Sequence, residues 1–327
     1  MSSIFPVTHS TPSVEALMTD ELPNYDIEPP TSCKLLQIGL NDTFLVNTQG
    51  AEYILRVYRA GWRTSSEIHY EIEALLHLKR KGISISVPVA RKDGNLVGTI
   101  MAPEGLRYIV LFTYAPGKEI AYTTDEENES YLYGKATAKI HAATDTFQSA
   151  HERFSLNLDY LLEVPLQTIR PHLSHRPEDW EYMLMMADKL RQRVQEIPLN
   201  SLETGFCHGD FHGWNAHLDK EKVLTFFDFD CCGMGWRAYD IAIFRWGARL
   251  GGKDSDRWQS FLRGYTEERN INDLDLQATQ YFVAIRHFWF MGLQAENSAD
   301  FGLSRINDGF FDRALKFFRE WEKEYLR

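Results

Sequence analysis

Three polar residues whose side chains can bind metals or accept protons follow short apolar runs between residues 206 and 228. Asp210 and Asn215 lie in FCHGDFHGWNAHL, residues 206–218, and Asp228 ends the apolar run TFFD. Carboxylate and amide oxygens are ligands for Mg²⁺, and a carboxylate can also orient and deprotonate a hydroxyl. Two chemistries fit these residues, metal-dependent phosphoryl transfer and metal-dependent hydrolysis.

The spacing of Asp210 and Asn215 favours phosphoryl transfer. An Asp followed five positions later by an Asn is the pattern of the protein-kinase catalytic loop, in which the Asp aligns the attacking hydroxyl and the Asn holds Mg²⁺. Residues 216–228 can form a hairpin that brings Asp228 beside Asn215. Asp228 would then bind the Mg²⁺ that bridges the phosphates of a nucleotide.

Hydrolysis is the competing chemistry, because His208, Asp210, His212 and His217 offer nitrogen and oxygen ligands within ten residues. A His-x-Asp-x-His pattern could bind zinc or a pair of metals. Such a site also recruits ligands from elsewhere in the chain, and the positions of the other histidines do not settle whether they supply them. Taken singly, Asp210 and Asn215 also fit ordinary turns.

Length and composition restrict the class of protein. A chain of 327 residues exceeds the usual size of a single core, so we expect two lobes. Forty-six acidic against thirty-five basic residues give a net charge of −11, which disfavours nucleic-acid and anionic-membrane partners and mildly favours a cationic one. The four cysteines have no CxxC spacing, and no signal-peptide pattern or run of about 20 apolar residues occurs. These features predict a cytoplasmic protein.

The elements expected to position the polar residues fall into two groups. Residues 1–12 predict a loose lead-in, and residues 13–115 predict a small antiparallel sheet that carries one helix, with a Ser cap at the front of residues 65–81 and Gly82 just beyond the end. Residues 116–327 predict a larger, mainly helical lobe. The fold class is therefore α+β, with two lobes. In the last helix Phe311, Leu315, Phe318 and Trp321 share one face, which predicts core packing.

Three segments carry a resemblance to a known family. FCHGDFHGWNAHL, FFDFD and RAYDIAIF follow a small β-rich lobe in this order, and they resemble the aminoglycoside phosphotransferase and choline kinase family. That family includes homoserine kinases and stress-response kinases and shares the bilobal fold of protein kinases. The resemblance covers about residues 13–327, and it is strongest over 205–245.

The resemblance implies a role for each matching residue. Asp210 would be the catalytic base, Asn215 and Asp228 the Mg²⁺ ligands, and His208 and Asp240 would support the loop. Arg56 would bind the phosphates of ATP, with Glu71 as its ion-pair partner. Asn41 lies in the loop expected over the phosphates. The hinge backbone expected to read adenine comprises Leu111, Phe112, Thr113 and Tyr114.

The sequence departs from the family pattern at three positions. Arg56 replaces the usual Lys, and a planar guanidinium is not equivalent to an ammonium. The loop around Gly39 lacks the G-x-G-x-x-G pattern. Asp230 stands where protein kinases have the Gly of D-F-G, and no A-P-E motif follows, which disfavours a regulated protein kinase.

These observations predict an enzyme that transfers the γ-phosphoryl group of ATP, with Mg²⁺, to a hydroxyl of a small molecule, which we expect to bear an amine. Candidate acceptor contacts are Asp230, His212, Trp214 and Arg286. Asp230 would instead have a structural role if it paired with Arg237 or Arg245, and a buried Arg286 could pair with a carboxylate of the protein itself. A stress-response protein Ser/Thr kinase and an inactive nucleotide-binding module also fit the sequence. The sequence identifies neither the acceptor nor the oligomeric state.

Overall fold

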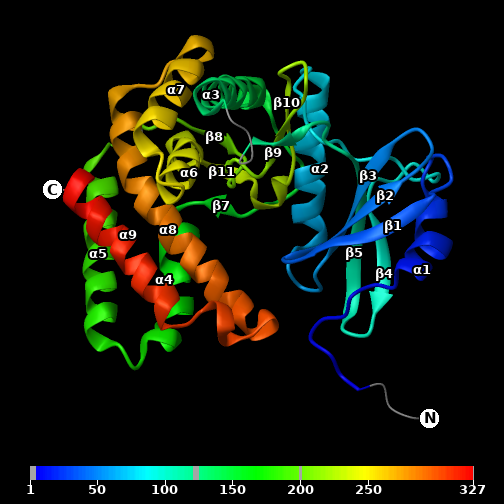
Figure 1. Cartoon of the computed structure of the whole chain (residues 1–327), viewed down its shortest axis with the longest axis horizontal. Helices are drawn as coiled ribbons and strands as arrows, with labels where there is room; N and C mark the ends of the chain where they lie inside the picture. Colours follow the sequence, from blue (N-terminus) through cyan, green and yellow to red (C-terminus); the bar gives the residue numbers. More distant parts are fainter. Residues whose placement is uncertain (1–4, 121–124, 199–200, 327) are drawn as a thin grey trace. The chain divides into compact units, whose positions relative to one another are not determined.

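The computed structural model describes residues 5–120, 125–198 and 201–326, which form two compact units (Figure 1). The first unit comprises residues 1–117, 148–153 and 217–227, and the second comprises 118–147, 154–216 and 228–327. The first unit thus includes two segments from the region that the sequence assigned to the helical lobe. Among the described residues, no helix is long and apolar enough to cross a membrane.

The first unit is built on a five-stranded sheet in the order β1-β2-β3-β5-β4, and all neighbouring strands are antiparallel. Apolar residues alternate along β2 and β3, so Phe44, Val46, Leu55 and Val57 share one buried core. The strands are β1 (Ser32–Ile38), β2 (Asn41–Asn47), β3 (Glu52–Tyr58), β4 (Gly98–Ala102) and β5 (Gly105–Thr113). The small antiparallel sheet predicted from the sequence is confirmed.

One long helix, α2 (Ser65–Arg80), belongs to this unit, and a short helix, α1 (Val14–Ala16), precedes the sheet. The cap of α2 is Thr64 rather than a Ser. Its side chain accepts from the backbone N–H of Glu67, whose carboxylate accepts from the backbone N–H of Thr64. Beyond the helix, Gly82 adopts a positive φ of 75°, a conformation that glycine tolerates at a helix end.

The segment expected to be a loose lead-in is bonded to the sheet. His9 Nε2 lies 3.1 Å from Asp42 Oδ1, and the Ser10 hydroxyl donates to Glu104 at 2.7 Å. Arg107, which is fully buried, donates to the Ser10 carbonyl at 2.7 Å and to Asp42 at 2.8 Å. A buried guanidinium needs acceptors, and the lead-in supplies one of them.

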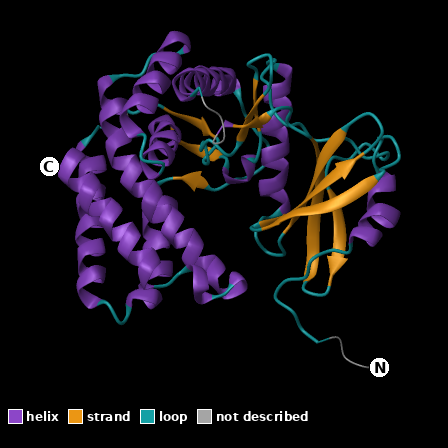
Figure 2. Cartoon of the chain, in the orientation of Figure 1, coloured by secondary structure: helices purple, strands orange, loops and turns teal. Residues whose placement is uncertain are grey.

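The second unit is mainly helical, as predicted, and Figure 2 shows its helices in purple. Its core includes Phe311, Leu315, Phe318 and Trp321, which confirms the buried face predicted for the last helix. Prolines interrupt the stretch before α5, where the structure has short helical turns around α4. The helices are α3 (Glu126–Ala143), α4 (Val164–Ile169), α5 (Pro177–Glu196), α6 (Arg237–Leu250), α7 (Asp254–Glu268), α8 (Asp273–Phe301) and α9 (Asp308–Tyr325).

Short strands in the second unit position the polar residues. Strand β8 (Thr204–Cys207) pairs antiparallel with β11 (Gly233–Trp236), and β7 (Ser155–Leu156) pairs with β11 on its other side. Cys207, the last residue of β8, is opposite Gly233, the first residue of β11. The chain therefore leaves β8 and enters β11 at the same end of the ribbon. Three further short strands are β6 (Lys118–Glu119) in the second unit, β10 (Leu224–Phe226) in the first unit, and β9 (Ala216–Leu218), of which residues 217–218 belong to the first unit.

Candidate active site

The segment 208–215 begins where β8 ends, and the segment 228–232 ends where β11 begins, so the two segments adjoin the same end of this ribbon. Gly209, in the first segment, fits against the second segment only because it lacks a side chain. Its φ is 78°, and a Cβ at this position would lie 2.2 Å from the carbonyl oxygen of Cys231. Asp210 and Asp228 thus belong to two backbone segments that pack closely against each other.

Asp240, on α6, holds the start of the 208–215 segment. Its Oδ2 accepts from the backbone N–H of His208 at 2.7 Å, and its Oδ1 accepts from that of Gly209 at 2.8 Å. His208 is fully buried, and its ring lies 4.4 Å from the Phe211 ring and 4.2 Å from the Phe229 ring. His208 Nδ1 accepts from the backbone N–H of Asp210 at 3.2 Å. Both residues occupy the supporting positions that the resemblance implied.

His141, on α3, supports Asp240 in turn and was not predicted from the sequence. Its Nε2 lies 3.2 Å from Asp240 Oδ2, and its Nδ1 lies 2.8 Å from the Tyr265 hydroxyl. Burial lowers the pKa of His141, although Asp240 opposes this effect, so the ring remains neutral at pH 7. A histidine on an apolar helical face gave no local signal of this role.

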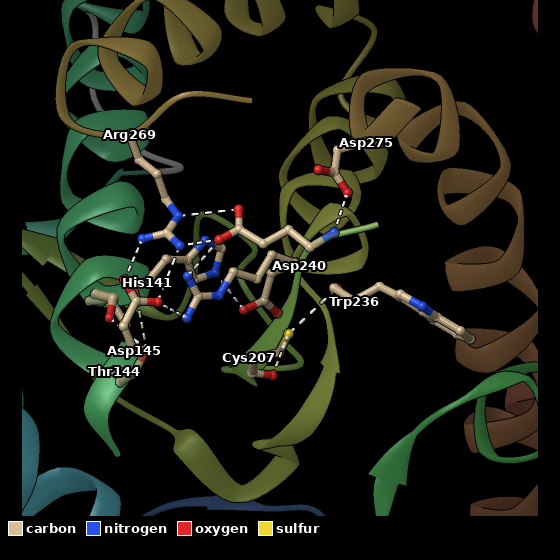
Figure 3. A network of polar contacts seen from close by, with 12 residues as sticks. His141, Thr144, Asp145, Cys207, Trp236, Asp240, Arg269 and Asp275 are labelled. Carbon is tan, nitrogen blue, oxygen red and sulfur yellow. Dashed lines mark hydrogen bonds and ion pairs between the residues drawn. The ribbon is translucent and has the colours of Figure 1, made fainter. Parts of the chain in front are cut away.

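A network of ion pairs lies next to this support (Figure 3). Arg237 and Arg269 both bond Glu203 and Asp145, and the backbone N–H of Glu203 donates to Asp275 at 3.0 Å. Glu203 directly precedes β8, whereas Arg237 begins α6. The network therefore ties the start of β8 to α6, to α8 and to Arg269 at the end of α7. These contacts fix the strand from which the 208–215 segment begins.

The Asp210 carboxylate receives hydrogen bonds on both oxygens. Oδ2 accepts from Asn215 Nδ2 at 3.0 Å and lies 3.1 Å from His212 Nε2. Oδ1 accepts from Arg286, a buried residue on α8. Burial alone would raise the pKa of Asp210, but His212 and Arg286 outweigh it and hold the pKa of this carboxyl well below its usual range. Asp210 is therefore an ionised hydrogen-bond acceptor.

Asn215 and Asp228 have the chemistry of a hard-cation site. The Asn215 amide nitrogen donates to Asp210, and within the described residues its Oδ1 accepts no hydrogen bond, so this oxygen is available to a metal. Asp228 follows β10 with φ 61° and ψ 60°, a left-handed conformation that is uncommon for residues other than glycine and clusters at functional sites. An amide oxygen and a carboxylate suit Mg²⁺, which keeps several waters or phosphate oxygens as its other ligands.

The same geometry argues against a zinc hydrolase. His208 Nδ1 accepts from the backbone N–H of Asp210, and His217 Nδ1 bonds the Ala115 carbonyl at 2.6 Å. No group of three or more His, Cys, Asp or Glu side chains in the described part of the chain could hold a metal ion. The His-x-Asp-x-His pattern therefore does not form a three-ligand site.

The remaining candidate acceptor contacts differ in their surroundings. Asp230 is buried and Trp214 is 45% exposed, with its ring 5.3 Å from the His212 ring. The two arginines considered as structural partners of Asp230 bond other groups. Arg237 bonds Glu203 and Asp145, and Arg245 bonds Asp254 and Gln280. The groups that Arg237 and Arg245 bond thus lie on other elements of the second unit, and the packing of the helices brings them close.

In the first unit, Arg56 and Glu71 form the ion pair that the resemblance implied. Arg56 donates to Glu71 Oε1 at 2.8 Å, and the Tyr58 hydroxyl donates to Glu71 Oε2 at 2.8 Å. The Arg56 guanidinium also lies 4.9 Å from the centre of the Phe112 ring, within range of a cation–π interaction. Tyr58 was not predicted, although its position two residues after Arg56 on one strand places both side chains on the same face.

The predicted hinge backbone is partly used within this unit. Leu111, Phe112 and Thr113 lie in β5, where the Leu111 carbonyl accepts from the Val89 N–H at 2.8 Å and the Thr113 N–H donates to the Val87 carbonyl at 2.9 Å. The Tyr114 N–H donates to the Glu52 carbonyl at 3.2 Å. Asn41 begins β2, and its carbonyl closes the preceding turn by accepting from the Gly39 N–H at 3.1 Å. Their contacts with a nucleotide stay predictions.

Residues 34–270 match the model of the phosphotransferase enzyme family, and the chain belongs to this family. An uncharacterised protein of Deinococcus radiodurans is 38% identical over 98% of this chain and 93% of its own length. The amicoumacin kinase of Bacillus subtilis is 27% identical over 74% of this chain and 73% of its own length.

Solved structures show the same fold. A microcompartment-associated aminopropanol kinase superposes with a TM-score of 0.77 at 22% identity and covers 96% of this chain and 99% of its own. The amicoumacin kinase hAmiN, in complex with AMP-PNP, Ca²⁺ and Ami, has a TM-score of 0.75 at 22% identity and covers 95% of each chain. The predicted family and α+β fold are confirmed. The protein is therefore a phosphotransferase of this family.

Proposed function

We propose that Asp210 aligns the acceptor hydroxyl and takes its proton, while Asn215 and Asp228 hold Mg²⁺. The observation that carries this assignment is the Asp210 carboxylate, fixed by donors on both oxygens beside the available amide oxygen of Asn215. When bound, Mg²⁺ neutralises the charge of the phosphates. The acceptor oxygen forms a bond to the γ phosphorus, the bond to the β–γ bridging oxygen breaks, and ADP leaves while the hydroxyl proton passes to Asp210.

The low pKa of Asp210 limits its part in this step. A strongly acidic carboxyl is a weak base, so its main contribution is to align the nucleophile through a hydrogen bond. The proton then transfers late, when the bond to phosphorus has largely formed and the hydroxyl has become acidic. Arg56 is proposed to bind the α and β phosphates, since Glu71, Tyr58 and Phe112 hold its guanidinium in one orientation.

For the acceptor, we propose a small molecule that carries an amine or quaternary ammonium beside its hydroxyl. The second unit presents Asp210, Asp228 and the buried Asp230 on neighbouring segments, and a cation would lower their mutual repulsion. The net charge of −11 acts in the same direction. The structural relative named as an aminopropanol kinase supports an acceptor of this kind.

We further propose that the protein acts in the cytoplasm and has no nucleic-acid partner, because its net charge of −11 would repel phosphate groups.

The decisive experiment is an acceptor screen coupled to ADP release. The panel contains 1-amino-2-propanol, choline, homoserine, kanamycin and adenosine, with glycerol as a neutral alcohol and glycerate as an anionic one. We expect a cationic acceptor to give the highest kcat/KM. A neutral or anionic compound as the best acceptor would overturn the proposed acceptor class without affecting the family assignment.

A charge-neutralising variant tests the part of Asp230 in this proposal. Asp230→Asn should raise the KM for the cationic acceptor while the Kd for MgATP stays unchanged. Asp256→Asn is the matched control, because it removes the same charge from an exposed position on α7. If both variants leave the acceptor KM unchanged, Asp230 has no part in acceptor binding.

A further inference from the structure

A buried arginine that the phosphotransfer steps above do not use contacts the proposed catalytic aspartate. Arg286 lies on α8, and its side chain is 3% exposed. Arg286 and Asp210 are 76 residues apart in the sequence, so the contact is a product of the fold. Placing a guanidinium in a core is costly unless acceptors compensate its charge, so this residue is expected to have a specific structural or functional task.

Two indole rings fix the plane of the Arg286 guanidinium. Its central carbon lies 5.0 Å from the centre of the Trp246 ring on α6 and 4.3 Å from that of Trp289 on α8. Both distances are within the range of a cation–π interaction. Because the guanidinium is planar, contact with the ring faces also determines the direction in which its N–H groups point.

Those N–H groups bond two points of one short stretch of chain. One terminal nitrogen donates to Asp210 Oδ1, and the other donates to the Gly209 carbonyl at 3.2 Å. The Gly209 carbonyl belongs to the peptide group directly before Asp210. A single rigid guanidinium therefore fixes both the backbone before Asp210 and the end of its side chain, which restrains the side-chain torsions between them.

The donors on the other carboxylate oxygen come from the loop itself. Asn215 Nδ2 donates to Oδ2, His212 Nε2 lies 3.1 Å from the same oxygen, and His212 Nδ1 accepts from the Trp214 N–H at 3.3 Å. These two donors move with the 208–215 segment. Arg286 is instead anchored in the helical core, and it transmits the position of α8 to the carboxylate.

We propose that Arg286 is the positioning residue that sets the orientation of the Asp210 carboxylate for the acceptor hydroxyl. This proposal rests on the proposed role of Asp210. It assigns to Arg286 a contact with the enzyme's own carboxylate in place of the acceptor contact predicted from the sequence. Because orientation affects the transfer step rather than ATP binding, loss of Arg286 should lower kcat and leave the Kd for MgATP unchanged.

The test compares Arg286→Ala and Arg286→Lys with the wild type, using the best acceptor from the panel. We expect kcat to fall by about 10² in the alanine variant, the range for a reacting group displaced by about 1 Å. The kcat of the lysine variant should lie between those of the alanine variant and the wild type, because one ammonium cannot reproduce both hydrogen bonds of the planar guanidinium. Millimolar guanidinium chloride should raise kcat of the alanine variant in a saturable manner. Calorimetry measures the Kd for MgATP.

Arg245→Ala is the matched control. Arg245 is also buried and pairs with Asp254 at 3.0 Å, and its guanidinium lies 4.5 to 5.0 Å from three aromatic rings. This variant should lose stability in a thermal melt, keep kcat in the folded fraction and show no response to guanidinium. Wild-type kcat in both Arg286 variants, or equal guanidinium responses in the Arg286 and Arg245 variants, would overturn the proposal. If the alanine variant does not fold, wild-type kcat in the lysine variant overturns it alone.

Asp210→Asn separates the two proposals. If this variant retains activity, the role of Asp210 fails and the role of Arg286 fails with it. If it is inactive while the Arg286 variants match the wild type, only the positioning role is wrong.

Discussion

Each unit contributes one arginine–carboxylate pair to the proposed chemistry, Arg56–Glu71 in the first unit and Arg286–Asp210 in the second, and the more exposed partner differs between the two pairs. In the first unit, the Glu71 side chain is 1% exposed and Arg56 is 8% exposed. In the second unit, the Arg286 side chain is 3% exposed and Asp210 is 16% exposed. The more accessible partner is the cation in the first pair and the anion in the second.

The contacts around each pair follow the same division. The enclosed Glu71 has both oxygens bonded, one by Arg56 and one by Tyr58. The enclosed Arg286 is flanked by two indoles and bonds the backbone as well as Asp210. In each pair the enclosed partner holds the accessible one in position. In each pair the more exposed member suits its proposed partner, because the Arg56 guanidinium suits an anionic phosphate and the Asp210 carboxylate suits a hydroxyl proton.

The largest effect is expected for the accessible carboxylate. Asp210→Asn should reduce kcat by between ~10² and ~10⁴, the range for removing a positioned proton acceptor, while MgATP still binds. Steady-state kinetics and calorimetry on the same preparation measure both quantities. Near wild-type turnover would show that the accessible member of this pair is not the proton acceptor.

The next largest effect is expected for removal of Asp228, the proposed metal ligand. Asp228→Ala is expected to lower turnover by about 10², because the enzyme loses a group that places the cation against the charge of the phosphates. Titration of nucleotide binding with Mg²⁺ should show a weaker dependence on the metal. Unchanged MgATP binding, together with stoichiometric zinc in the wild type, would instead support a metal-dependent hydrolase.

The comparison of the pairs also shows what could be predicted from the sequence. Asp210 and Asn215 are five residues apart and hydrogen-bonded, so their spacing carried the prediction. The Arg56–Glu71 pair joins a strand to the helix that follows it, and the resemblance indicated it. Arg286 and His141 reach the 208–240 region from 76 and 99 residues away, and such contacts depend on helix packing that no local pattern describes.

In the second unit, closeness in the sequence predicts poorly which residues form ion pairs. Arg237 and Arg245 follow Asp230 closely along the chain, but α6 directs both of them toward carboxylates on other elements. The strands and long helices were predictable because alternating or helical patterns of apolar residues determine which face is buried. The short turns around α4 were missed, since prolines interrupt the pattern there.

Replacing the accessible arginine should have a smaller effect on a different parameter. Arg56→Ala is expected to raise the KM for ATP by about tenfold, the value of one charge-assisted hydrogen bond, with little change in the acceptor KM. Arg56→Lys should recover part of this loss, because an ammonium supplies the charge without the planar fork. Equal changes in the two KM values would place Arg56 outside the nucleotide site.

The smallest effects separate the supports of the two units. Tyr58→Phe removes the hydroxyl that bonds Glu71 in the first unit, and Tyr133→Phe removes the buried hydroxyl that donates to the His212 carbonyl at 3.0 Å in the second. Each change deletes one phenolic hydroxyl from a fully buried side chain, so each should lower the free energy of unfolding by about 1 to 3 kcal/mol. Denaturant titration measures this loss, and the two variants serve as controls for each other.

Their kinetic effects should differ even though their stabilities change alike. Tyr58→Phe leaves Glu71 Oε2 without this donor, so Arg56 should be held less firmly and the KM for ATP should rise a few-fold at constant kcat. Tyr133→Phe loosens the backbone beside Asp210, so kcat should fall a few-fold at constant KM for ATP. If both variants changed the same parameter, the supports would act on the whole enzyme, and the division between enclosed and accessible partners would have no functional meaning.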